Sequence, residues 1–178
     1  LLIYGKTAYK MNKGRLEAFS DGVLAIIITI MVLEMKAPED TSIRTLIPII
    51  PIFLSYVLSF IYIAIYWLNH HHLFQATQKI ETAVLWANMD LLFWVSLIPF
   101  TTSWLGENHL EPVPVAFYGG VLLMSAIAFR ILEVSLVKSH AENIPFVGVI
   151  RQSRKERTSI IVYTLGISLA FVHIAISI

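Results

Sequence analysis

Apolar runs of about 20 residues recur along this chain, and that is the length a helix needs to cross the hydrocarbon of a bilayer. The hydrophobic share is 57% and the charged share 14%, and both values depart from those of ordinary soluble domains. We therefore expect an all-α polytopic membrane helix bundle, with residues 1–178 forming a single transmembrane domain. The five runs extend from Leu16 to Met35, Thr45 to Leu68, Thr82 to Leu105, Val113 to Val137 and Ser159 to Ile178.

The segments between the runs carry charge or turn-forming residues, as polar breaks between membrane helices should. They read KAPEDTSIR, NHHHLFQATQKIE, GENHLEP and KSHAENIPFVGVIRQSRKER. Pro48, Pro51 and Pro99 fall inside runs, where we expect each proline to kink a helix without ending it. The last run stops on an apolar residue. We expect either a chain cut short before a further span, or a short fifth span whose tail begins a sixth.

The basic residues predict which side of the membrane each segment faces, because cytoplasmic segments collect Lys and Arg. With the N-terminus inside, the outer segments carry only Lys36 and Arg44. The inner segments then carry Lys6, Lys10, Lys13, Arg15, Lys79, Lys138, Arg151, Arg154, Lys155 and Arg157. We therefore place residues 1–14 in the cytoplasm and the first membrane helix at about residues 16–35.

Several function classes lack the residues that their chemistry needs. The chain has no Cys, which excludes disulfides, thiolate metal sites and Cys nucleophiles, and it has no basic tract typical of nucleic-acid binding. His70, His71 and His72 are consecutive, so on a helix their side chains cannot all converge on one metal ion. Neither His-Glu-x-x-His nor Gly-x-Ser-x-Gly occurs. We expect no metal, no cofactor, no nucleic-acid partner and no enzyme activity.

Polar residues at the start of the first run are costly in lipid and are therefore candidates for function. In one interpretation Ser20 or Asp21 caps the helix and Arg15 extends to the lipid phosphates. In the other, the apolar face that includes Leu16 starts the helix before Asp21, which buries the carboxylate. Its cationic partner would then be Arg15 or one of the three histidines that end the second run.

Branched apolar side chains also follow helical spacing along this first run. Ile26, Ile30 and Leu33 lie at i, i+4 and i+7, with Thr29 beside them on the same face. Such a stripe is commonly a helix-packing surface, but lipid already solvates aliphatic groups and gives the stripe little drive to pack. A face of this kind with one hydroxyl group is therefore also suited to lining a narrow pore.

Two charged residues of opposite sign lie inside later runs. We expect Asp90 in the third run and Arg130 in the fourth to form an ion pair, since a lone charge in the membrane is costly. Glu133 follows Arg130 by about one helical turn and is an alternative local partner.

The stretch RLEAFSD, residues 15–21, fits the Arg-x-x-x-Phe-Ser-Asp signature that opens the first helix of the transmembrane-protein-175 family. This family comprises potassium channels of prokaryotic membranes and animal lysosomes. WLNHHHLF, LWANMDLLFWVSLIPFTT and AFYGGVLLMSAIAFRILE resemble further parts of the family in the same order. The resemblance covers almost the whole chain, although the later motifs are weak individually.

The resemblance implies a potassium channel built as a homotetramer, with six membrane helices in each subunit and K⁺ as the permeant ion. Four copies of the first helix would surround the ion path. Neither the family nor this sequence has the Thr-Val-Gly-Tyr-Gly filter, so a ring of loop carbonyls is not available for selectivity. A single short repeat resembles the prokaryotic members, which implies a plasma membrane location.

The family pattern also implies roles for individual residues. Ile26 falls at the narrowest apolar constriction, where prokaryotic members commonly have Leu, and Ile30 and Leu33 follow it on the pore face. Thr29 falls in a hydroxyl layer that contributes to potassium preference. The polar network that holds the first helix against its neighbours would contain Arg15, Ser20, Asp21 and His70.

Other function classes make different demands on the sequence. A secondary transporter usually has broken helices in repeated halves, and no internal repeat is evident. A proton-permeable channel is a variant of the channel class, and a purely structural membrane subunit is a third alternative.

Overall fold

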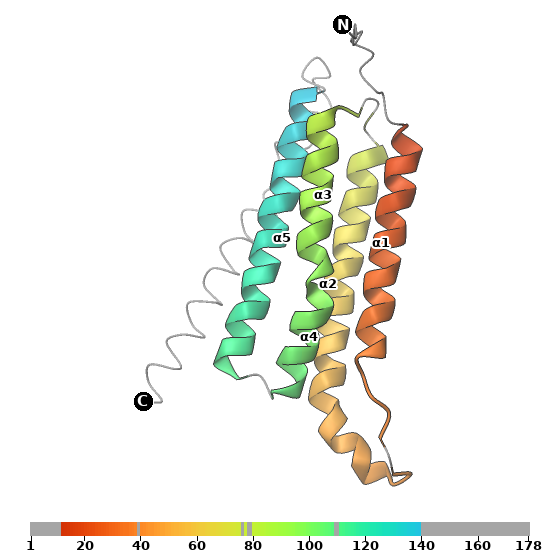
Figure 1. Ribbon diagram of the computed structural model, residues 1–178, viewed down its shortest axis with the longest axis vertical. Coiled ribbons are helices and arrows are strands. Elements are labelled where there is room, and N and C mark those ends of the chain that lie inside the picture. Colours follow the sequence, from red (N-terminus) through yellow and green to blue (C-terminus); the bar gives the residue numbers. More distant parts are fainter. Residues whose placement is uncertain (1–11, 39, 76, 78–79, 109–110, 140–178) are drawn as a thin grey trace, which may run out of the picture.

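The computed structural model describes residues 12–38, 40–75, 77, 80–108 and 111–139, and this part of the chain forms an elongated helical bundle (Figure 1). Its elements are α1 (Lys13–Leu33), the 3₁₀ helix η1 (Ile43–Ile49), α2 (Ile50–Gln75), α3 (Thr82–Ser96), α4 (Ile98–Glu107) and α5 (Pro112–Ser139). Within the described residues, four helical stretches are long and apolar enough to cross a membrane: Lys13–Leu33, Ile43–Gln75, Thr82–Glu107 and Pro112–Ser139. The first four predicted runs are therefore confirmed as helices, and the fifth, from Ser159 to Ile178, lies outside the described residues.

The first helix begins earlier than its apolar run. Asn12 caps α1, because its Oδ1 accepts a hydrogen bond of 2.9 Å from the amide of Gly14. The interpretation in which Ser20 or Asp21 caps the helix is therefore wrong, since both lie in its third turn. The helix ends at Leu33.

The second membrane helix is longer than its apolar run. Pro48 lies inside η1. Pro51 lies in the first turn of α2, where backbone amides have no partner within the helix, so the missing amide hydrogen of proline costs no helical hydrogen bond. The helix then continues to Gln75, and the prediction that a polar break begins after Leu68 is wrong. The reason is packing: His70, Leu73 and Phe74 are all buried, so this last part of α2 contributes to the core.

The third run is divided into two helices. α3 ends at Ser96 and α4 begins at Ile98, with Leu97 between them. Pro99 has no amide hydrogen and cannot bond back to the preceding turn, so the helix is interrupted at Leu97. The prediction that Pro99 kinks this run without ending it is confirmed, since Thr82–Glu107 remains one helical stretch long enough to cross a membrane.

The core runs along the centre of the bundle. α5 packs against α3 and α4, while α2 packs against α4 and α1 lies along α2, α3 and α4. Leu16, Ile63, Phe74, Ile98, Leu132 and Leu136 are among the side chains with no exposed surface. Hydroxyl groups also join three helices, because Ser59 Oγ on α2 lies 2.7 Å from Thr102 Oγ1 on α4 and 2.9 Å from Tyr118 Oη on α5. The core thus combines apolar packing with bonded polar groups.

Candidate functional site

One side of α1 packs on the bundle, and the other side has no partner among the described residues. Leu24, Ile27 and Met31 are buried at 5%, 3% and 2% exposure. Ile26 and Leu33 are exposed by 58% and 77%. The predicted stripe is therefore the unpartnered side of the helix.

Thr29 belongs to the same exposed side. Its hydroxyl donates a hydrogen bond of 2.8 Å to the carbonyl of Ile26 in the preceding turn. A hydroxyl that donates its proton in this way still has lone pairs on its oxygen. Thr29 can therefore offer an acceptor to an ion or a water molecule beside α1.

A buried hydrogen-bond chain holds the packed side of α1. His70 Nε2 on α2 donates to Asn88 Oδ1 on α3 at 2.8 Å, and Asn88 Nδ2 donates to Ser20 Oγ on α1 at 3.0 Å. Ser20 Oγ in turn donates to the carbonyl of Leu16 at 2.9 Å. We call His70, Asn88 and Ser20 the polar clamp, since these bonds connect three helices. The ring of His70 also stacks on Phe74, with centroids 4.5 Å apart.

Asp21 makes a different contact from the one expected. Its side chain is exposed and accepts a hydrogen bond of 2.9 Å from Trp67 Nε1 on α2. Among the described residues, the expectation of a buried carboxylate paired with Arg15 or a histidine is therefore wrong, because Asp21 is exposed and its donor is a neutral indole. Arg15 is exposed and has no side-chain hydrogen bond among the described residues.

Two members of this region, Asn88 and Trp67, were not found from the sequence. Asn88 carries a usable signal, because an amide inside an apolar run needs a partner when it is buried. Trp67 carries none, since tryptophan near a helix end is common at membrane interfaces. The fold alone brings both residues beside α1.

The other two histidines do not join the clamp. His71 is stacked on Trp67 with centroids 5.7 Å apart, and its Nε2 accepts a hydrogen bond of 2.8 Å from Gln75 Nε2. His72 is exposed. Among the described residues, no group of three His, Cys, Asp or Glu side chains is placed to hold a metal ion.

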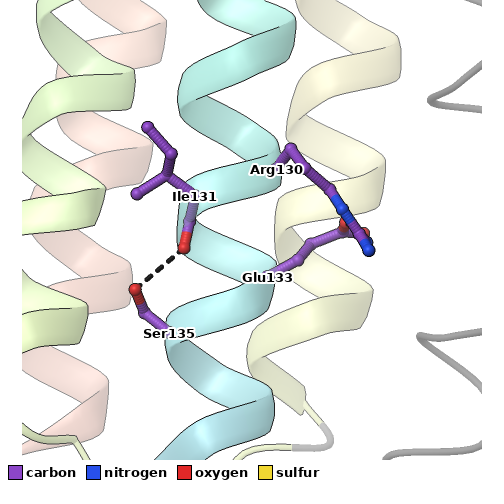
Figure 2. Close-up of polar contacts among 4 residues, drawn as sticks. All are labelled: Arg130, Ile131, Glu133 and Ser135. Carbon is purple, nitrogen blue, oxygen red and sulfur yellow. Dashed lines mark hydrogen bonds and ion pairs between the residues drawn. The ribbon is translucent and has the colours of Figure 1, made fainter.

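The charged residue Arg130 of the fourth run pairs within its own helix. Arg130 Nη1 lies 2.9 Å from Glu133 Oε2 on the same helix, and this is the ion pair found among the described residues. Figure 2 shows the two side chains meeting on one side of α5, while Ser135 bonds to the carbonyl of Ile131 on another side. The expected pairing of Arg130 with Asp90 is therefore replaced by the alternative pairing with Glu133.

The fold and this site define a class: a polytopic, all-helical membrane protein whose first helix is clamped by polar contacts on one side and unpartnered on the other. The sequence profile of the family described as endosomal/lysosomal potassium channel TMEM175 matches residues 15–99, which include the clamp and the exposed stripe. A potassium channel of Chryseobacterium sp. (strain P1-3) is 56% identical over 163 residues, covering 92% of this chain and 85% of that protein. The chain belongs to the TMEM175 family.

Solved structures and more distant relatives agree with this assignment. The crystal structure of a lysosomal potassium-selective channel TMEM175 homolog from Chamaesiphon minutus matches with a TM-score of 0.76 at 31% identity. The match covers 90% of this chain and 87% of that one. The human endosomal/lysosomal proton channel TMEM175 is 34% identical over 101 residues, which are 50% of this chain and 20% of that protein. The expected family and all-helical fold are thus confirmed.

Proposed function

We propose that this chain is the subunit of a potassium channel in the plasma membrane of a prokaryote. The observation that carries the proposal is the unpartnered stripe of α1, held by the polar clamp, in a chain 56% identical to a protein named as a potassium channel. Channel activity needs no cofactor and no bond-making chemistry from the protein.

Four copies of α1 would surround the ion path in a homotetramer. Ile26 would form the narrowest ring, and Ile30 and Leu33 would continue the apolar wall. A ring of apolar side chains gates by excluding water, and an ion passes when the ring widens. The 58% exposure of Ile26 and the 77% exposure of Leu33 support this role, because most of each side chain is left uncovered by the described part of the chain.

Thr29 would supply the polar layer of the pore. Its proton is engaged by the carbonyl of Ile26, so its oxygen is the part of the group available to a cation. Four hydroxyl oxygens offer fewer ligands than a cage of backbone carbonyls. We therefore expect a modest preference for K⁺ over Na⁺.

The polar clamp would set the rotation of α1 about its own axis. Ser20 is bonded on the packed side, while the stripe begins at Ile26, between one and two turns later, on the exposed side. A rotation that broke the bond to Asn88 would move Ile26 away from the channel axis. The contact between Trp67 and Asp21 adds a second tie to α2.

The N-terminus would lie in the cytoplasm. α1 begins and α5 ends at the same end of the bundle, so Lys13, Arg15 and Lys138 lie there together (Figure 1). Lys36 follows the other end of α1, and Arg44 lies in the 3₁₀ helix that comes next along the chain. This arrangement supports the orientation with the basic ends inside.

Proton permeation is the second candidate function. It is favoured by the animal relatives, since those of rat, mouse, zebrafish, chicken and human are named as proton channels. A channel that conducts protons would shift its reversal potential when a pH gradient is applied at constant K⁺.

A reversal potential in a planar bilayer with asymmetric K⁺ and Na⁺ tests the potassium channel directly. The purified protein should give unitary currents that reverse nearer the potassium equilibrium potential than the sodium one. Ile26→Asn should raise the unitary conductance several-fold and weaken the selectivity, because an amide hydrates the constriction. Ile61→Asn is the matched control, since Ile61 is 51% exposed on α2, away from the stripe.

Two results would count against this proposal. No unitary current from an assembled complex, across a range of voltages and pH values, would remove the channel function. Currents that change equally in Ile26→Asn and Ile61→Asn, or in neither, would remove Ile26 from the constriction.

A further inference from the structure

A groove of about 510 Å³ opens between the last turns of α1 and the α3–α4 pair. Its lining includes Ile30 and Glu34 from α1, Ser96 from the end of α3, and Trp104 and Glu107 from α4. Ile30 also belongs to the exposed stripe, with 40% of its surface free. The groove therefore lies on the flank of the helix that would line the pore.

The interruption between α3 and α4 favours a polar environment in this groove. Ser96 and Pro99 both line it, and they flank the point where the helical backbone is broken. Irregular backbone at membrane depth occurs where it is buried in protein or lines a water-filled cavity. A hydrated or charged ligand is therefore better suited to this part of the groove than a hydrocarbon chain is.

The charge of the groove favours a cation. Glu34 and Glu107 supply two carboxylates, and none of the lining residues is basic. α1 and α4 both end here, and neither has a basic residue in its last turn. The C-terminal ends of helices carry partial negative charge, so their dipoles add to the two carboxylates.

Aromatic rings form the remaining wall. Phe100 and Trp104 lie with ring centroids 6.1 Å apart, and Trp104 meets Phe117 edge-on at 5.5 Å. Phe117 thus supports Trp104 from the side of α5. An aromatic face beside carboxylates is a combination that binds ammonium groups carrying apolar substituents.

We propose that this groove is a binding site for an organic ammonium cation. The apolar substituents would contact Ile30, Pro99 and Phe100, and the charged nitrogen would lie by Trp104 in the field of Glu34 and Glu107. A cation bound there fixes Ile30 from the side and reduces the current through the pore. This effect on current rests on the proposed channel function, whereas the binding itself does not.

Binding of tetrapropylammonium to the purified full chain tests the site without any flux measurement. Calorimetry at constant ionic strength should detect saturable binding of tetrapropylammonium. A titration with a K⁺ salt is the reference. Glu107→Gln should weaken the affinity several-fold, and Trp104→Leu about tenfold through loss of the cation–π contact. The matched controls are Glu81→Gln and Trp86→Leu, both exposed on or before α3 and outside the groove, and these should bind as the wild type does.

The outcomes separate this proposal from the channel function. No saturable binding to the wild type would overturn the site, as would equal losses in the Trp104 and Trp86 variants. If a lipid tail or a neighbouring copy of the chain fills the groove, the wild type will show no saturable binding. Glu107→Gln keeps the test valid if Trp104→Leu does not fold. Saturable binding that requires Glu107 would uphold the site even if K⁺ flux were absent, and that absence would count against the channel alone.

Discussion

Asn88 connects three helices from a position with no exposed surface. It donates to Ser20 on α1 and accepts from His70 on α2, so its amide uses both of its functional groups. No buried side-chain nitrogen or oxygen in the described part of the chain lacks a partner. Every buried polar side chain of the clamp is therefore hydrogen-bonded, and replacing Asn88 would leave hydrogen-bonding groups of its neighbours without a partner.

Asn88→Leu should lower the free energy of unfolding by about 1–2 kcal/mol, because the N–H of His70 loses its acceptor inside the bundle. Ser20 keeps its bond to the carbonyl of Leu16 and loses less. Thermal unfolding in detergent measures the change. Asn69→Leu is the matched control, since Asn69 is exposed on α2. Equal stability of both variants would show that the clamp contributes nothing.

Residue patterns predicted the exposed stripe more accurately than they predicted the polar contacts. Helical spacing alone places Ile26, Ile30 and Leu33 on one face, and the structure leaves that face open. The partner of Asp21 depended on which α2 residue packs beside α1, and that contact is set by the fold. Trp67 lies inside the predicted second run, but the run does not indicate which of its side chains faces Asp21 on α1.

At the scale of the elements, α4 is held closely against α2. Gly106 is buried, and a Cβ atom at this position would lie 2.7 Å from the Cα of Ile52. Such a contact is with backbone, so the helices would have to separate. The hydroxyls of Ser59, Thr102 and Tyr118 tie the same helix to α2 and α5. Together these contacts fix α4 although it is cut off from α3 at Leu97.

Gly106→Ala should therefore destabilise the protein by about 1–3 kcal/mol, the usual cost of overpacking a close contact. Thermal unfolding in detergent again provides the measurement. Gly120→Ala on α5 is the control, because nothing lies within 4 Å of its added Cβ. We expect the control to stay close to the wild type. A Gly106 variant as stable as the control would mean that α2 and α4 separate at no cost.

Helices were predicted well as elements, while their ends were not. Apolar length identified the four described membrane helices, since hydrocarbon sets that length. Pro99 predicted the interruption near Leu97, because its missing amide hydrogen removes a helical hydrogen bond. The extension of α2 to Gln75 depends on tertiary packing, which the apolar run does not indicate.

At the scale of the whole molecule, the proposed function requires several copies to meet at α1. The described part of one chain leaves the stripe facing outward, and other helices also expose apolar side chains, such as Trp86 at 73% on α3. Exposure alone does not distinguish a pore face from a lipid face. The position of the neighbouring subunit does, and the absence of Cys from the sequence allows it to be probed with single introduced thiols.

Leu33→Cys should form cross-linked dimers in membranes with a short bismaleimide, because four copies of α1 would bring these thiols near a shared axis. The native mass of the wild-type complex should equal four chains. Trp86→Cys is the control, since the proposed tetramer around α1 would place this exposed position on α3 away from the shared axis. Cross-linking of the Trp86 variant but not of the Leu33 variant would place the interface on α3. In that case α1 would face lipid, and its stripe would not line an ion path.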